Sequence, residues 1–198
     1  MPLKVVRQKV DRAWTLTKRL LVLMCVWGMV FSVATISRLA VAFDYDDTLV
    51  SSEAAFHKAL GRFPQDFSPQ FWSVVNKSYD LDNPKFLPWT LAWAFRVCGF
   101  RVTVVTSRPA VDADGLKKDW RRLVARGRFI FVPDKNSKHQ VLQSGNYVLF
   151  FGDSDSDVSE ARAAHVLPVR VRRGSKSIFK EDYNPGSMGE FVLPLSQY

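Results

Sequence analysis

Three acidic residues stand within four positions in the stretch VAFDYDDTLVSS, which covers Val41–Ser52. Carboxylates crowded in this way repel one another and lose hydration, and a bound cation is what lets them stay ionised together. Neither cysteine nor histidine occurs in this stretch, and a ligand set made only of oxygen atoms favours a hard cation such as Mg²⁺. We therefore expect a divalent-cation site that includes Asp44 and Asp46.

Three later motifs carry residues that suit the same chemistry. VVTSR contains Thr106 and NSKHQVL contains Lys138, and a hydroxyl and an ammonium beside a metal suit a bound phosphate group. GDSDSD adds further carboxylates at Asp153, Asp155 and Asp157. Together these residues predict that the substrate carries a phosphoryl group and that the reaction is phosphoryl transfer.

Short apolar segments alternate with helical patterns, which predicts an α/β fold with a parallel sheet and right-handed crossovers. The expected strands cover 39–43, 101–106, 129–132, 147–151 and 167–171. The expected helices cover 53–60, 83–98, 112–127 and 137–143, with a last one that ends near 164. Residues 61–82 are rich in Pro, Phe, Ser and Trp, and we expect an irregular insertion that serves as a substrate lid. Ligands in such folds bind at the carboxyl ends of strands, where the motifs fall.

In chain order, FDYDDT, VVTSR, NSKHQVL and GDSDSD resemble the four motifs of the haloacid dehalogenase (HAD) superfamily of phosphatases. The part from GDSDSD to Tyr198 is similar throughout to the class B acid phosphatases, and FSPQFWSVVN resembles their insertion. The likeness covers Leu39–Tyr198. It implies a Rossmann-like parallel sheet flanked by helices, with a small cap-like insertion. It also implies a Mg²⁺-dependent acid phosphatase that acts on small phosphomonoesters such as nucleotides, with phosphotransfer to an alcohol as a variant.

The resemblance assigns roles to residues at matching positions. Asp44 would be the nucleophile that forms an aspartyl-phosphate, and Asp46 would protonate the leaving alcohol and then activate water. The carboxylates of Asp44 and Asp153 would bind Mg²⁺ together with the backbone carbonyl of Asp46. Asp157 would orient Lys138 or a metal-bound water.

Four residues would hold phosphate oxygens: Thr106, Ser107, Arg108 and Lys138. Plainer interpretations stand beside some assignments, with Lys138 as an ordinary lysine at a helix start, Arg108 as a cap of the strand exit, and Asp155 as a solvent-facing acid rather than a metal ligand. The three histidines are expected on the surface or in packing, without partner residues. Four aromatic residues would line a pocket for a nucleoside or aryl leaving group, or would pack in the core: Phe56, Phe71, Trp72 and Phe179.

Two other classes of function use similar residues. A receiver-type signalling domain also combines acids, a threonine and a lysine. In such a domain, however, the phosphoacceptor aspartate follows the third strand and comes before the threonine and the lysine in the sequence. Here Thr106 and Lys138 precede the last acidic cluster, and no aspartate directly follows FIFV. The second alternative is a membrane-anchored interaction protein with a vestigial HAD site, against which the complete set of motif residues argues.

The composition limits the number of domains and the partners. The chain has 198 residues, enough for one α/β domain with a real core and too few for two comfortable ones. Its formal net charge of +9 is concentrated in the N-terminal stretch, in 117–128 and in 170–180. No basic-aromatic signature accompanies these residues, so we expect no nucleic-acid polymer as a partner. Cys25 and Cys98 form neither a disulfide framework nor a metal-binding pattern.

Residues 1–19 form a basic segment, and residues 20–37 contain the uncharged run LLVLMCVWGMVFSVATI at Leu20–Ile36. A basic flank before such an apolar helix is typical of a secretory signal peptide or an uncleaved signal anchor. The HAD-like domain at 38–198 would then be extracytoplasmic, in the periplasm or secreted, and membrane-anchored unless the chain is cleaved after SVA at Ser32–Ala34. A buried or oligomer-forming helix is the alternative.

The segment FLPWTLAWAFRVCG at 86–99 is apolar almost all round, whereas a surface helix has a polar face. Trp89 and Trp93 would therefore lie against a membrane or cover a subunit interface, and the second option makes a homo-oligomer an expectation.

Overall fold

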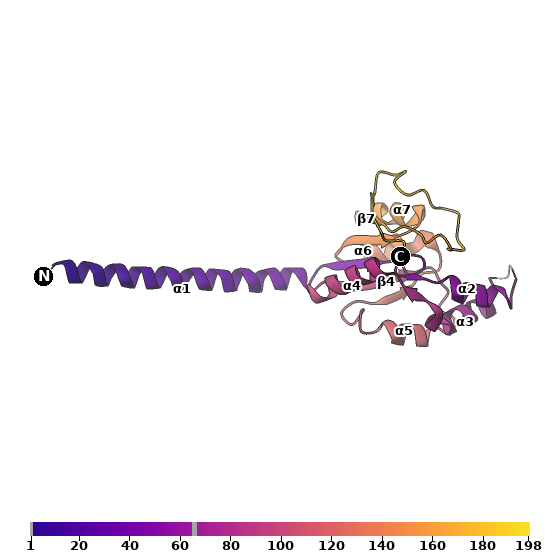
Figure 1. The fold of residues 1–198 in the computed structure, drawn as a ribbon, viewed down its shortest axis with the longest axis horizontal. Coiled ribbons are helices and arrows are strands. Elements are labelled where there is room, and N and C mark those ends of the chain that lie inside the picture. The colour runs from indigo at the N-terminus through magenta and orange to yellow at the C-terminus, as the bar shows by residue number, and fades with distance from the viewer. Residues whose placement is uncertain (1, 65–66) are drawn as a thin grey trace. The chain divides into compact units, whose positions relative to one another are not determined.

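The computed structural model describes residues 2–64 and 67–198. It divides into two units, Met1–Ser37 and Arg38–Tyr198, and Figure 1 shows the elements of both. The first unit consists of helix α1, which covers Pro2–Ile36. Its part Thr17–Ile36 has 20 residues and a mean hydropathy of 2.0, so it is long and apolar enough to cross a membrane. A signal sequence has the same properties, and α1 is compatible with both alternatives.

The second unit contains a six-stranded sheet in the order β5-β4-β1-β6-β7-β8, in which every neighbouring pair is parallel. The strands are β1 Ala40–Phe43, β4 Arg101–Thr106, β5 Phe129–Phe131, β6 Tyr147–Gly152, β7 Leu167–Arg170 and β8 Phe191–Val192. All four residues of β1 are buried, as expected for an apolar strand that is covered on both faces. The predicted α/β fold with a parallel sheet is confirmed.

The register of the three central strands positions the motif residues. Phe43 of β1 is paired with Val104 of β4 on one side and with Phe151 of β6 on the other. The residues that directly follow these strands therefore emerge together at one edge of the sheet, where ligands bind in folds of this kind. FDYDDT, VVTSR and GDSDSD meet for this reason.

Helices α4 Phe86–Val97 and α5 Asp114–Trp120 pack on one face of the sheet, and α6 Lys138–Gln143 and α7 Asp155–Ala163 pack on the other. Helices α2 Glu53–Leu60 and α3 Pro69–Lys77 pack in a separate apolar cluster, and two short 3₁₀ helices cover Tyr79–Leu81 and Lys135–Ser137. Val41 and Phe43 pack in one apolar cluster with side chains of α4 and α5. Ala42 lies in a second cluster, with side chains of α6 and α7. Successive side chains of β1 point to opposite faces of the sheet and thus pack in two different apolar clusters.

The insertion at 61–82 differs from the expected irregular segment, because it contains helix α3. The residues that suggested irregularity begin this helix: Ser68 is its N-cap, with a hydroxyl that accepts from the Phe71 N–H, and Pro69 occupies the first turn. Phe71 then packs with Phe56 of α2 in a third apolar cluster. The described part of the insertion therefore contains a helix that packs against α2, where an irregular segment was expected.

Two other helices are shorter than their sequence patterns predict. The helix expected over 112–127 ends at Trp120, and the chain turns back toward the sheet to begin β5. On this return Gly127 lies so close to β4 that a Cβ there would be 1.8 Å from the Val102 carbonyl oxygen. The helix expected from residue 83 begins at Phe86 because β3, Asn83–Pro84, is paired with β2, Val50–Ser51.

Helix α4 leaves part of its apolar surface uncovered. The exposed fraction is 74% for Phe86, 39% for Trp89 and 82% for Val97, whereas Trp93 packs against the core. The subunit or membrane contact expected at this helix stays a prediction.

Candidate active site

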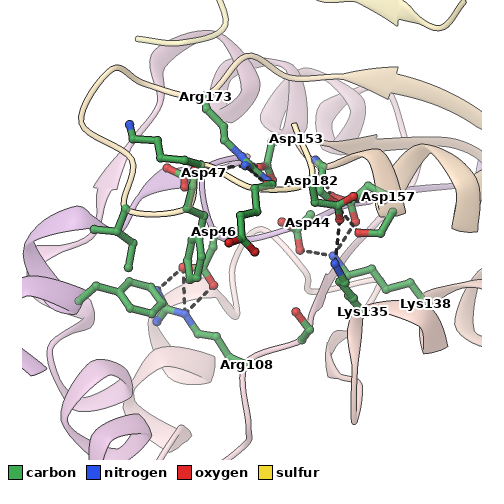
Figure 2. Close-up of a pocket in the computed structure, with 18 of the residues that line it drawn as sticks. Asp44, Asp46, Asp47, Arg108, Lys135, Lys138, Asp153, Asp157, Arg173 and Asp182 are labelled. Carbon is green, nitrogen blue, oxygen red and sulfur yellow. Dashed lines mark hydrogen bonds and ion pairs between the residues drawn. The ribbon is translucent and has the colours of Figure 1, made fainter. Parts of the chain in front are cut away.

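A pocket of about 610 Å³ lies at the carboxyl ends of the central strands (Figure 2). Most predicted site residues line it: Asp44, Asp46, Ser107, Arg108, Lys138, Asp153 and Asp157. Thr106 is buried and does not line the pocket, and its hydroxyl oxygen accepts from the backbone N–H of Arg108 at 3.1 Å. The structure thus brings together residues that are more than a hundred positions apart in the sequence.

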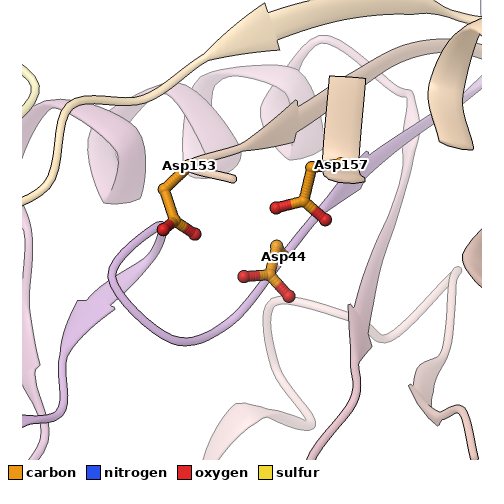
Figure 3. A group of neighbouring side chains, drawn as sticks. All are labelled: Asp44, Asp153 and Asp157. Carbon is orange, nitrogen blue, oxygen red and sulfur yellow. The ribbon is translucent and has the colours of Figure 1, made fainter. Parts of the chain in front are cut away.

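Three carboxylates form a buried group within this pocket (Figure 3). Asp44, Asp153 and Asp157 each offer one oxygen atom, and these atoms lie within 4.8 Å of one another. Asp157 is held by a capping box at the start of α7, because the Ser154 hydroxyl accepts from its N–H while its carboxylate accepts from the Ser154 N–H.

The electrostatics of this group fit a divalent cation. Burial raises the pKa of Asp44 well above its ordinary value, and the charges of Asp157 and Asp153 raise it further while Lys138 opposes them. Burial and the charge of Asp157 likewise raise the pKa of Asp153, against the opposing effect of Arg173. A cation among the three oxygens would offset both effects, and a donor set made only of carboxylates suits a hard ion.

Lys138 connects two of these carboxylates. Its Nζ donates to Oδ1 of Asp44 at 2.6 Å and to Oδ1 of Asp157 at 2.7 Å, and its side chain is almost completely buried. Burial lowers the pKa of Lys138, but Asp157 and Asp44 outweigh that effect and raise the pKa above its ordinary value. The lysine therefore carries its charge at the base of the pocket.

Asp46 is held by Arg108, which the sequence suggested as a phosphate ligand or a cap of the strand exit. The Arg108 Nε lies 2.8 Å from Oδ2 of Asp46, and its Nη2 lies 2.6 Å from Oδ1. The Ser52 hydroxyl donates to the same carboxylate. Arg108 is 1% exposed, so this ion pair has little access to water.

The loop after β1 is fixed by side chains from distant segments. Asp47 has a positive φ of 53°, and its carboxylate accepts a hydrogen bond from the Ser177 hydroxyl. Lys85 donates to the Asp47 carbonyl at 2.6 Å. The Thr48 hydroxyl donates to Oδ1 of Asp153 at 3.0 Å, which ties the loop to the carboxylate group.

Arg173 was not predicted from the sequence as a site residue. Its Nε forms an ion pair with Asp153, and its Nη1 donates to the carbonyls of Phe179 and Glu181 at 3.1 and 2.7 Å. It follows β7 at the pocket edge of the sheet, inside the basic run 170–180. The position of that run directly after a strand was the available signal.

Several side chains near the pocket have surroundings that differ from those expected from the sequence. Asp155 lies outside the carboxylate group and accepts from Arg170 and Asn184, each at 2.7 Å, so it is neither a ligand of that group nor a free surface acid. Of the four aromatic candidates, Phe56 and Phe71 are buried in the third apolar cluster, and Phe56 also lines the pocket, as do Trp72 and Phe179. His139 does have a partner, since its Nδ1 lies 2.7 Å from Glu160.

Comparison with known proteins identifies the family. A class B acid phosphatase from Klebsiella pneumoniae is 32% identical to this chain over 174 residues, which cover 81% of the chain and 73% of that protein. The chain belongs to the class B acid phosphatase family. A second class B acid phosphatase, from Salmonella typhimurium, is 30% identical over the same shares of the two chains. No protein-family model matches the chain.

Solved structures support the fold of this class B acid phosphatase. A predicted phosphatase from Clostridium acetobutylicum superposes with a TM-score of 0.53 at 16% identity, covering 78% of this chain and 93% of that chain. The predicted fold, a parallel sheet flanked by helices, and the prediction of a phosphomonoesterase are confirmed.

Proposed function

We propose that this class B acid phosphatase is a Mg²⁺-dependent enzyme that hydrolyses small phosphomonoesters through an aspartyl-phosphate intermediate. Asp44 supports this proposal most directly. It directly follows the central strand β1, lines the pocket and lies beside both an ammonium group and two further carboxylates. A carboxylate held in this way can attack phosphorus, and covalent catalysis divides a difficult displacement into two easier steps.

In the first step an oxygen of Asp44 forms a bond to phosphorus as the bond from phosphorus to the ester oxygen breaks. Asp46 gives its proton to the departing alkoxide, which leaves as an alcohol. In the second step Asp46 takes a proton from water, and the resulting hydroxide attacks the aspartyl-phosphate. Inorganic phosphate is released and Asp44 is restored. An alcohol in place of water would receive the phosphate instead, which is the phosphotransferase variant of the proposal.

The metal would be held by the carboxylates of Asp44 and Asp153 and by the backbone carbonyl of Asp46. Bound there, Mg²⁺ would supply positive charge to the phosphoryl oxygens. Asp157 lies close enough to join the carboxylate group, and its bond to Lys138 supports the positioning role that the family resemblance implies.

Phosphate oxygens would be held by Lys138 and by the hydroxyl of Ser107, which line the pocket. The phosphate contact expected of Thr106 stays a prediction, because its buried side chain does not line the pocket. The ammonium of Lys138 lies where negative charge develops during transfer, and fixed donors of this kind stabilise such charge. Arg108 has one terminal nitrogen, Nη1, without a hydrogen-bond partner among the described residues, and this atom supports its predicted phosphate contact.

Nucleotides are the proposed substrates because the pocket has an aromatic side. Phe56, Trp72 and Phe179 line it together with the charged residues, and rings of this kind suit a flat nucleoside or aryl leaving group. We place the domain outside the cytoplasm, with α1 as a signal peptide or as an anchor, because the candidate span Thr17–Ile36 follows the basic segment 1–19.

A panel of phosphomonoesters assayed with Mg²⁺ and with a chelator tests the proposal. We expect hydrolysis that needs the metal and that disappears in Asp44→Asn, which removes the nucleophile but keeps the side-chain shape. Activity that survives this change, or that ignores the chelator, would contradict the mechanism. A folded wild-type protein that hydrolyses no ester in the panel would favour an interaction protein with a vestigial site.

A further inference from the structure

Asp82 lies at the end of the insertion, outside all four sequence motifs, yet it reaches the catalytic region. Its side chain is buried, and Oδ2 accepts from the Tyr45 hydroxyl at 2.9 Å and from Nη2 of Arg108 at 3.3 Å. Tyr45 stands between the proposed nucleophile and the proposed proton carrier in the sequence, and it is completely buried. Asp82 therefore contacts both the motif loop after β1 and the arginine that follows β4.

Arg108 is held on several sides. Its guanidinium carbon lies 4.7 Å from the ring centroid of Tyr45 and 5.5 Å from that of Phe56, so both rings are within the distance of a cation–π contact. Its Nε and Nη2 form a two-point contact with Asp46, and Nη2 also contacts Asp82. A bidentate pair of this kind fixes the plane of the carboxylate as well as its position. Figure 2 shows Arg108 directed at Asp46.

Charge balance alone does not account for Asp82. Asp46 already neutralises the guanidinium, and a second buried carboxylate costs desolvation free energy. A role in orienting the guanidinium would account for this cost. Asp82 is suited to that role because the Tyr45 hydroxyl fixes its carboxylate while the same carboxylate contacts Arg108. The insertion also contacts the loop after β4 that carries Arg108, since the Asn76 amide donates to the carbonyls of Pro109 and Val111 at 2.9 and 2.7 Å.

We propose that Asp82, with Tyr45, is a positioning residue for proton transfer: the pair fixes Arg108, and Arg108 holds the carboxylate of Asp46 toward the leaving oxygen. This inference rests on the proposed function, in which Asp46 donates the proton. When the bond from phosphorus to the ester oxygen breaks, the alkoxide of a poor leaving group needs that proton. A nitrophenolate does not need it, because it leaves readily as an anion.

The test compares two substrates in the Mg²⁺-saturated full-length protein. We expect Asp82→Ala and Tyr45→Phe to lower kcat/KM for an alkyl phosphate such as glycerol phosphate by about 10- to 100-fold, because a misplaced Asp46 loses part of a general-acid effect that is typically about 10²- to 10⁴-fold. For p-nitrophenyl phosphate the loss in kcat/KM should be about threefold or less, because its leaving group needs little protonation and the later hydrolysis of the aspartyl-phosphate, which also uses Asp46, does not enter kcat/KM. Tyr45→Phe removes only one hydroxyl, so it keeps the test valid if Asp82→Ala does not fold.

The control variant is Asp112→Asn, which removes another acid that contacts the insertion, at Ser73 and Lys77 of α3, without touching Arg108. It should leave both rates unchanged. A merely structural role for Asp82 predicts equal losses for the two substrates, and that result would overturn the proposal.

A double mutant separates this inference from the proposed function. If Asp82 acts through Asp46, then Asp82→Ala should cost nothing further for the alkyl phosphate in an Asp46→Asn background. A full additional loss in that background would refute the inference while leaving the aspartyl-phosphate mechanism intact. Failure of the proposed function would appear separately, as activity that persists in Asp44→Asn.

Discussion

The Nζ atom of Lys138 lies 2.6 Å from Oδ1 of Asp44, although 94 positions separate the two residues in the sequence. Asp44 follows the central strand and Lys138 opens α6, so the parallel sheet brings them to the same edge. The lysine offsets part of the repulsion among three buried carboxylates and lies where a transferring phosphoryl group would carry charge. The ammonium of Lys138 therefore contributes both to the stability of the metal-free site and to the proposed chemistry.

Lys138→Met should show both effects. We expect kcat to fall by about 10²- to 10³-fold, the loss seen when one fixed transition-state donor is removed. With chelator present, the free energy of unfolding should fall by about 3 kcal/mol, because a buried ion pair loses one partner. Kinetics and urea denaturation measure the two quantities. Lys77→Met, which removes an exposed lysine from the surface pair with Asp112, is the control and should change neither.

Metal binding should stabilise the domain, and the effect should depend on Asp153. At a Mg²⁺ concentration about a hundred times the Kd, the expected gain is about 2.7 kcal/mol, or roughly 5 to 10 °C in Tm. Asp153→Asn should remove most of this shift in a thermal melt. Asp155→Asn alters an acid two positions away that binds Arg170 and Asn184 instead, and it should keep the shift. An equal shift in both variants would place the metal elsewhere.

Much of the fold and part of the site were predictable because they depend on local patterns. Apolar runs such as that of β1 indicate strands, and the position of the motifs directly after such strands predicts that Asp44 and Asp153 lie at one edge of the sheet. Contacts made by residues outside the motifs were not predictable. Arg173 reaches Asp153 only because the chain after β7 turns over the pocket, and Asp82 reaches Arg108 only because the insertion folds back.

The helix ends were missed for a related reason. Propensity continues past Trp120, but the chain must return there to begin β5, and tertiary structure overrides the local preference. In the insertion, Ser68 and Pro69 were interpreted as loop residues although they also suit the first turn of a helix. Both patterns are ambiguous until the surrounding structure is known.

Stability of the metal-free protein should fall as pH rises from about 4.5 to 7.5. Burial raises the pKa of Asp47 to about 6 and that of Asp82 to about 7. Between their ordinary values near 4 and these raised values, the folded protein binds more protons than the unfolded chain, so rising pH favours unfolding. Asp47→Asn should flatten the curve, by on the order of 2 kcal/mol across this range.

Denaturation at several pH values in chelator measures this dependence. Asp112→Asn is the matched control, because Lys77 and Ser73 lower the pKa of Asp112 by hydrogen bonding. The stability that Asp112 contributes is lost only as pH falls below the ordinary pKa of an aspartate, which is outside the tested range. A wild-type protein that gains stability between pH 4.5 and 7.5 would contradict the expected direction.

Gly152→Ala should disturb the carboxylate group through steric contact. A Cβ at this position would lie 2.4 Å from Cβ of Asp157, so the aspartate must move and take Lys138 with it. We expect a loss of about 1 to 3 kcal/mol in the free energy of unfolding, typical of overpacking, together with reduced kcat. Gly61→Ala is the matched control, because Gly61, the C-cap of α2, has helical backbone angles and its new Cβ would have ordinary clearance of 3.4 Å from the nearest atom. That change should be neutral or slightly stabilising.

Deletion of Leu20–Ile36 should change where the enzyme is found without unfolding it, because the sheet and the pocket lie within the second unit. Cell fractionation followed by phosphatase assay measures the distribution. The intact chain should be membrane-bound or extracytoplasmic, and the deleted chain should stay in the cytoplasm with its activity. N-terminal sequencing of the mature protein distinguishes the two forms of export, since a new terminus after Ala34 indicates a cleaved signal and an intact terminus indicates an anchor. An identical soluble cytoplasmic pool for both chains would show that the apolar segment serves neither purpose and would favour the alternative of a packing or oligomer-forming helix.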